Sequence, residues 1–143
     1  MVEYRNRLME MGHEAIIHPD YDKWVTGDEP EWVKRAEKEH HKVKREYGFI
    51  KWYHDSIKNS DAILVLNFDK NGVKNYVGGN TLMEMGFAHV NDKRVFLLNS
   101  APEMGYREEI LATTDKVIND DLTKVKPKTR LQNLLSTKPK LFK

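Results

Sequence analysis

Two continuous apolar runs stand out in a chain whose other segments mix polar and charged residues. They are Asp61 to Asn67 (DAILVLN) and Arg94 to Asn99 (RVFLLN). Apolar runs of this length, bounded by polar residues, predict strands buried on both faces of a sheet. A shorter run, Lys116 to Asn119 (KVIN), predicts a last strand.

The first part of the chain has a helical pattern followed by a short apolar segment. Met1 to Met11 carries apolar residues with helical spacing, and Gly12 is typical of the residue that ends a helix. His13 to His18 (HEAIIH) then predicts a strand that stops at Pro19. Helix, glycine and strand form the second half of a parallel crossover unit.

In a doubly wound domain a strand precedes the first helix, and none precedes it here. We therefore expect an N-terminally truncated domain, or a sheet whose central position is filled by a partner chain or by rearrangement.

Four further segments have helical patterns, and the stretch between the first predicted strand and the second helix is expected to be a polar loop, Tyr21 to Pro30. The expected helices are Glu31 to Glu46, Phe49 to Asn59, a helix capped by Asn80 or Thr81 that runs to Val90, and Tyr106 to Ala112. A last helical stretch should begin at Asp121 or Thr123, be interrupted at Pro127, and pack through Leu131, Leu134 and Leu135.

Helices that alternate with strands predict an α/β domain with a mostly parallel sheet flanked by helices. With 143 residues, one domain over 1–143 is the expectation.

Composition excludes several classes of protein. The chain has no cysteine, which rules out disulfides and thiol catalysis and favours a cytoplasmic location. It has no apolar run long enough to span a membrane. The net charge of +2 is too balanced to indicate nucleic-acid binding. The histidines, including the adjacent pair His40 and His41, lack metal-ligand spacing, so neither a metal nor another cofactor is expected.

Polar residues follow each predicted strand, at the edge where open α/β sheets bind ligands. Asn67, Asn99 and Asn119 offer donors and acceptors that suit sugar hydroxyls or base edges, although asparagine is also common wherever a strand turns. We take Asn67 and Asn99 as candidate substrate contacts. The turn formed by Gly78, Gly79, Asn80 and Thr81 adds four more, because glycines let a ligand approach the backbone closely.

Glu84 is the only ionisable side chain between Val77 and Ala88. It has two interpretations. With Thr81 it matches a capping box, in which the glutamate binds the cap amide of its own helix. Alternatively, the apolar setting raises its pKa and leaves the carboxylate for a ligand, as in enzymes that attack an anomeric carbon.

Three segments together resemble the nucleoside 2-deoxyribosyltransferase-like superfamily, which includes deoxynucleoside 5′-monophosphate N-glycosidases. They are SDAILVLN, NYVGGNTLMEMGFAH and KRVFLLN. The resemblance implies a flavodoxin-like, Rossmann-like fold and a homo-oligomer that acts on a small nucleoside or nucleotide. It implies that Glu84 is the nucleophile, with the turn from Gly78 to Thr81 against the sugar or 5′-phosphate. Two positions depart from the family pattern: Tyr53 and Gly78 stand where members often carry acidic residues.

Three functions therefore remain open: an N-glycosidic-bond enzyme that uses Glu84, a catalytically silent nucleotide-binding domain, and an interaction module. In the last, the charged helix Glu31 to Glu46 would contact a partner.

Overall fold

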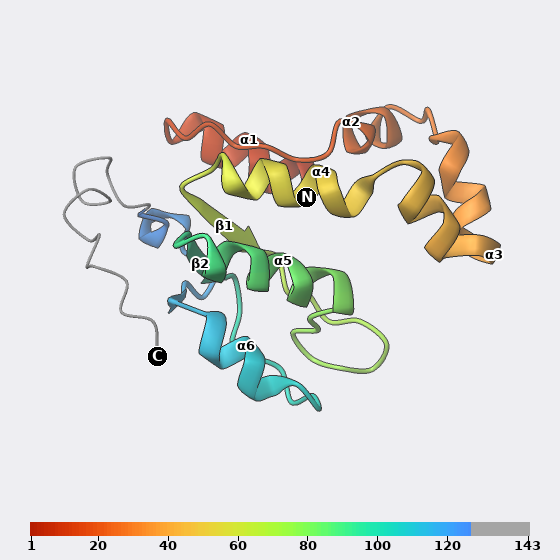
Figure 1. Ribbon diagram of the computed structural model, residues 1–143. Coiled ribbons are helices and arrows are strands. Elements are labelled where there is room, and N and C mark those ends of the chain that lie inside the picture. The colour runs from red at the N-terminus through yellow and green to blue at the C-terminus, as the bar shows by residue number, and fades with distance from the viewer. Residues whose placement is uncertain (127–143) are drawn as a thin grey trace. The chain divides into compact units, whose positions relative to one another are not determined.

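A computed structural model describes residues 1–126 of the protein, which form a mixed α/β structure that includes a small parallel sheet (Figure 1). Its strands are β1 (Ala62–Val65), β2 (Arg94–Leu97) and β3 (Lys116–Val117), in the order β1-β2-β3 with both pairings parallel. All three lie inside the apolar runs that predicted them. Within residues 1–126 no strand pairs with the other side of β1, so β1 is an edge strand.

The described residues form six α-helices, of which all but α2 lie in segments where the sequence predicts a helix. They are α1 (Val2–Glu10), α2 (Asp20–Val25), α3 (Glu31–Glu46), α4 (Phe49–Lys58), α5 (Gly79–Val90) and α6 (Arg107–Thr113). The stretch expected from Asp121 or Thr123 is a single 3₁₀ turn, Leu122–Lys124, and the predicted continuation with Pro127, Leu131, Leu134 and Leu135 lies outside the described residues. No helix in the described part is long and apolar enough to cross a membrane.

The chain divides into two compact units, Met1–Ser56 and the part that starts at Ile57. The second unit contains the whole sheet together with α5 and α6. The single domain expected over 1–143 stays a prediction.

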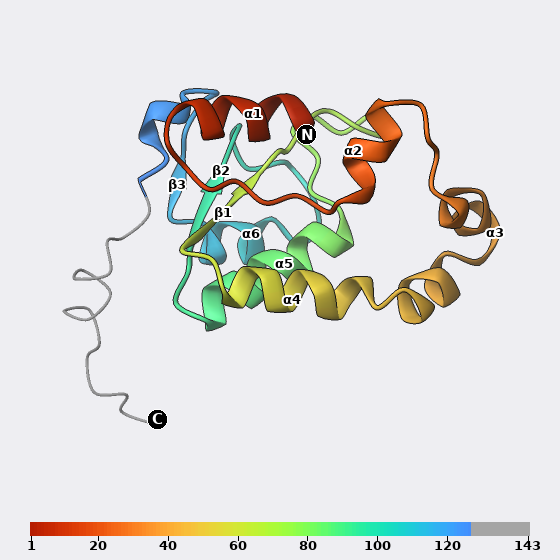
Figure 2. The ribbon, with the colours of Figure 1, turned by 90° about the horizontal axis from the view of Figure 1, so that it is seen from above.

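The core of the second unit joins the strands to α5 and α6. Figure 2 shows α5 beside β1 and β2, with α6 next to α5. The buried members of this core are Ile57, Val65, Val77, Met85, Ala88, Val95, Leu97 and Ile110. From Val95 in β2 to Leu98 just after it, four successive residues are at most 1% exposed, which confirms the prediction that this strand is buried on both faces. The same prediction is wrong for most of β1, an edge strand in which Val65 is buried and the three residues before it are half-buried.

The predicted strand His13 to His18 is wrong. The segment has no regular secondary structure, and Ile16 keeps 55% of its surface exposed. A strand is stable only where a neighbouring strand pairs with its backbone, and no described segment does so here. The glycine that precedes it was predicted correctly: Gly12 has a φ of +90° and its amide donates to the carbonyl of Met9, closing α1.

The polar loop predicted for Tyr21 to Pro30 is also partly wrong, because its first residues form α2. Contacts from outside the segment hold this short helix. The Arg5 guanidinium lies 2.6 Å from the Asp22 carboxylate, and the indole N–H of Trp32 donates to Asp20 over 2.6 Å. Neither contact can be read from the local pattern.

Helix α3 has the predicted limits but is not continuous. Glu39 has non-helical backbone angles (φ −132°, ψ 47°), so the helix bends sharply there. Arg35 and Glu46, which would be far apart on a straight helix, form an ion pair of 2.9 Å across the bend.

Candidate functional site

The carboxyl ends of β1 and β2 are joined by a reciprocal pair of asparagines. The backbone amide of Asn99 donates to Oδ1 of Asn67 over 2.8 Å, and Nδ2 of Asn99 donates to the Asn67 carbonyl over 3.1 Å. The Asn67 amide group also donates to the carbonyls of Asn99 and Ser100, at 3.0 and 3.1 Å. The structure therefore brings these two candidates together at the carboxyl ends of β1 and β2.

The two asparagines differ in what they can offer a ligand. Asn67 is 1% exposed and its side-chain polar atoms are occupied within the protein, so its role is to fix the loops at this edge. Asn99 is half-buried, and among residues 1–126 its Oδ1 accepts no hydrogen bond. Asn99 can therefore present an acceptor to a substrate. Asn119, after β3, is exposed with a φ of +49°, as expected of a residue that only turns the chain.

The loop between β1 and α5 is held by its own hydrogen bonds. Lys70 and Val73 pair across a tight turn in which Asn71 and Gly72 both have positive φ. The Asp69 carboxylate accepts the backbone amide of Asn75 over 2.8 Å. These contacts fix the conformation of the loop that leads to the start of α5.

Helix α5 begins earlier than predicted. Gly78 is the cap, helical structure starts at Gly79, and no side chain binds the cap position. The prediction that Asn80 or Thr81 caps the helix is therefore wrong. Because Thr81 lies within the first turn, Thr81 and Glu84 do not form a capping box, and the structural interpretation of Glu84 loses its basis.

The Glu84 carboxyl is half-buried on an apolar helix. Within residues 1–126 it forms no hydrogen bond and no ion pair, and burial raises its pKa to about 7. A carboxylate without compensating donors is costly to bury, so the proton is retained to higher pH. Such a group is a candidate for chemistry rather than for stability.

The other predicted residues of the turn lie one helical turn before Glu84. Asn80 and Thr81 precede it by four and three residues, a spacing that places side chains on the same helix face. Asn80 and Gly79 are exposed, whereas Thr81 and Gly78 are half-buried. Of the four predicted contacts, Asn80 and Thr81 thus share a helix face with the carboxyl, whereas Gly78 and Gly79 form the start of the helix before them.

Two tyrosines near this turn were missed by the sequence reasoning. The Tyr106 hydroxyl donates to the carbonyl of Val77 over 2.6 Å, just before the helix cap. Burial raises the pKa of Tyr106, and the nearby Tyr76 phenol raises it further. The Tyr76 ring packs against Gly78, where an added methyl group would lie 3.3 Å from its Cε1 atom. No sequence pattern marks these residues, although an aromatic side chain two positions before a Gly-Gly pair is a usable hint.

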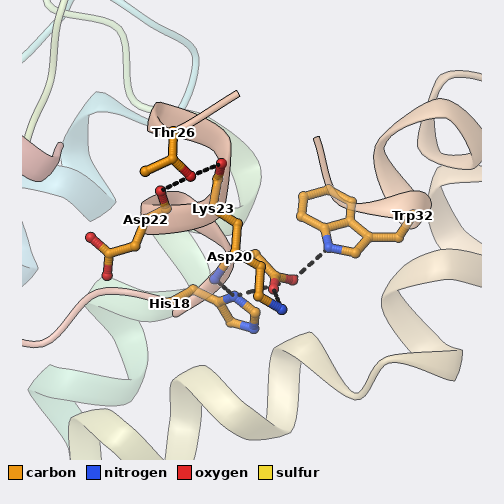
Figure 3. A network of polar contacts seen from close by, with 6 residues as sticks. All are labelled: His18, Asp20, Asp22, Lys23, Thr26 and Trp32. Atoms are coloured by element: carbon orange, nitrogen blue, oxygen red, sulfur yellow. Dashed lines mark hydrogen bonds and ion pairs between the residues drawn. The ribbon is translucent and has the colours of Figure 1, made fainter. Parts of the chain in front are cut away.

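The first unit contains its own polar cluster around Asp20, which Figure 3 shows. The Asp20 carboxylate accepts the Trp32 indole N–H and lies 3.6 Å from Nδ1 of His18. The His18 ring in turn packs edge-on against Phe49 and Trp52, with centroids 5.2 and 4.7 Å away. This cluster ties the start of α2 to α3 and α4, so its evident role is structural. In residues 1–126 no group of three or more potential ligands could hold a metal ion.

Comparison of the sequence with protein-family models and with curated proteins, and of the structure with solved structures, gives no match. The family suggested by the three motifs therefore stays a prediction that rests on those motifs alone.

Proposed function

We propose that this protein cleaves or transfers the N-glycosidic bond of a (deoxy)nucleoside or its 5′-monophosphate, with Glu84 as the nucleophile. The observation that carries the proposal is the state of the Glu84 carboxyl. It is half-buried on an uncharged stretch of α5, and no other group in residues 1–126 binds it.

The reaction would proceed in two displacement steps. The ionised Glu84 carboxylate attacks the anomeric carbon, and the bond from that carbon to the base nitrogen breaks. The base leaves with the bonding electron pair and takes up a proton, and a glycosyl ester remains on Glu84. Attack by water, which loses its proton, gives hydrolysis, and attack by a second base gives transfer. Both restore the free carboxylate.

The burial of Glu84 supports this role physically. With its pKa at about 7, roughly half of the carboxyl groups are ionised at neutral pH. The ionised form is poorly solvated and more basic than an exposed glutamate, which makes it a better nucleophile. Formation of a neutral ester then removes the charge from an apolar site.

The other candidate residues would either contact the substrate or position the loops around it. Asn99, Asn80 and Thr81 would contact the substrate, whereas Asn67 would position the loops around it. The proposal includes a flavodoxin-like arrangement of the sheet, self-association, a cytoplasmic location and catalysis without a cofactor.

A nucleotide-binding domain without catalysis is the second candidate. One observation favours it. Members of the family that the sequence resembles often carry acidic residues at two positions where this chain has Tyr53 and Gly78. The two candidates differ in whether any base is released from a bound nucleotide.

The test is release of free base from a panel of deoxynucleosides and their 5′-monophosphates. Wild type should release base, and Glu84→Ala and Glu84→Gln should lose it almost completely. Glu108→Gln, a matched change at an exposed position on α6, should retain full activity. Wild-type binding of a 5′-monophosphate without release would support the second candidate instead.

A further inference from the structure

The edge of β1 that faces away from β2 has backbone groups without partners. The carbonyls of Asp61 and Val65 accept backbone amides at the start of β2 and just past its end, over 3.3 and 3.0 Å. Backbone groups of successive strand residues point to opposite sides, so those of Ala62 and Leu64 point away from β2. Within residues 1–126 these outward amides and carbonyls form no hydrogen bond.

The composition of β1 leaves this edge unprotected. Proteins commonly protect an edge strand with charged side chains or proline, and the four residues Ala62–Val65 include neither. Three of the four are half-buried. Backbone groups of half-buried residues are unfavourable without partners, so the edge is expected to receive a further strand.

The segment His13 to His18 has the complementary deficiency. Its exposure alternates, with Glu14 and Ile16 exposed and the residues between and beside them half-buried. This alternation is typical of a strand with one covered face. From Glu14 to Ile17, no backbone amide or carbonyl forms a hydrogen bond within residues 1–126. The chain thus contains a strand edge without a neighbour and a strand-like segment without a neighbour.

Pairing across two copies of the chain would satisfy both deficiencies at once. Within one chain the two do not pair, because the sheet of the described residues contains β1, β2 and β3 alone. If the segment of each copy adds to β1 of the other, the two contacts are equivalent, as a symmetric dimer requires. Addition of a strand to an exposed sheet edge is a common mode of recognition, in which backbone hydrogen bonds supply the affinity.

We propose that two copies of this protein associate by strand exchange, in which His13 to His18 of each copy pairs with the open edge of β1 in the other. Ile16, which is 55% exposed in the single chain, is covered in the dimer. This inference identifies the segments that form the self-association included in the proposed function, and it does not depend on the role of Glu84.

The first experiment measures the mass of the protein by light scattering during size-exclusion chromatography. Wild type should have twice the chain mass of 16.8 kDa. Ile16→Lys places a charge in the exchanged strand and should raise the dissociation constant of the dimer about tenfold or more. Ile50→Lys is the matched control, because Ile50 is a similarly exposed isoleucine on α4, and it should leave the dimer intact.

The absence of cysteine from the chain allows a direct test of which segments pair. Ile16→Cys is mixed under mild oxidation with a second single-cysteine variant, which is Ala62→Cys, Ile63→Cys or Leu64→Cys, so that different registers are covered. A disulfide between two different variants necessarily joins two chains, and it should form with at least one of the three. Ile50→Cys should form none with any of them.

Amide hydrogen exchange tests the edge of β1 itself. In wild type the Leu64 amide, which points away from β2, should be protected nearly as well as the Val65 amide, which points toward it. In Ile16→Lys the Leu64 amide should exchange about tenfold faster or more, whereas the Val65 amide should be unchanged. An unchanged Val65 amide also shows that the variant is folded.

Three results would overturn strand exchange. They are a wild type with the mass of one chain, a dimer that Ile16→Lys leaves intact, and a protein with both Ile16→Cys and Ala62→Cys that forms its disulfide only within one chain. None of these results affects the role of Glu84, because loss of base release in Glu84→Gln is expected with or without the exchange. Absence of base release from wild type would likewise leave the exchange intact.

Discussion

Replacement of Glu84 by glutamine should stabilise the protein at alkaline pH. The folded state holds the Glu84 proton up to a pKa of about 7, whereas an unfolded chain releases it near the ordinary value of 4.5. Between these values the folded state binds more protons than the unfolded state. The free energy of unfolding therefore falls as pH rises through this window, and the contribution present at low pH is lost above about pH 7.

The size of the effect follows from the shift in pKa. A difference from 4.5 to about 7, at 1.36 kcal/mol for each unit, corresponds to roughly 3 kcal/mol. Because the carboxyl is only half-buried, residual water reduces this, and about 1–3 kcal/mol is the expected range. Glutamine has nearly the same shape and no charge, so Glu84→Gln should be more stable than wild type by this amount at pH 8. At pH 4.5 the two proteins should be nearly equal.

The measurement is urea unfolding followed by far-ultraviolet circular dichroism, for wild type and variant at pH 4.5, 6, 7 and 8. Other titrating groups are the same in both proteins, so the difference between the two free energies isolates Glu84. Glu108→Gln, on the exposed surface, should show no pH-dependent difference from wild type. A difference in the free energy of unfolding between Glu84→Gln and wild type that stays constant across the pH range would refute the raised pKa. It would also refute the conclusion that ionised Glu84 destabilises the folded protein.

Three further predictions concern activity and packing. Base release should increase with pH through about 7 as Glu84 ionises, and a kcat profile that is flat from pH 5 to 8 would contradict its role as nucleophile. Asn67→Ala should lower the free energy of unfolding by about 2–4 kcal/mol, because it leaves the buried partners of Asn67 without hydrogen bonds; the exposed Asn59→Ala, measured in the same urea titration, should change it by less than about 0.5 kcal/mol. Trp32→Phe removes the indole donor to Asp20 and should cost about 2 kcal/mol in thermal unfolding, and an unchanged melting temperature would show that this bond contributes nothing.

The parts of the fold that the sequence predicts are those whose signal is local. Between their polar ends, the runs that contain β1 and β2 are apolar at successive positions, a pattern typical of strands in a buried parallel sheet. The predicted strand from His13 to His18 has a similar pattern but lacks a pairing partner among the described residues. Pairing depends on residues far away in the sequence, so a strand pattern alone is insufficient.

Long-range contacts also explain the missed elements. Helix α2 is too short to be stable through the helix propensity of its own residues. Contacts of Arg5 with Asp22 and of Trp32 with Asp20 stabilise it instead. At the candidate site, Glu84 is visible in the sequence because it is the one charge in an apolar stretch. Tyr76 and Tyr106 are not, because their importance arises only when two separate segments meet at the start of α5.

The distribution of tryptophan between the two units has a spectroscopic consequence. All three tryptophans, Trp24, Trp32 and Trp52, belong to the unit Met1–Ser56, whereas the unit that carries Glu84 has tyrosine but no tryptophan. Fluorescence excited at the red edge of the tryptophan band will therefore report on the first unit alone, and circular dichroism will report on both. Coincident transitions by the two probes would mean that the units unfold as one cooperative system, and separate transitions would give each unit its own stability.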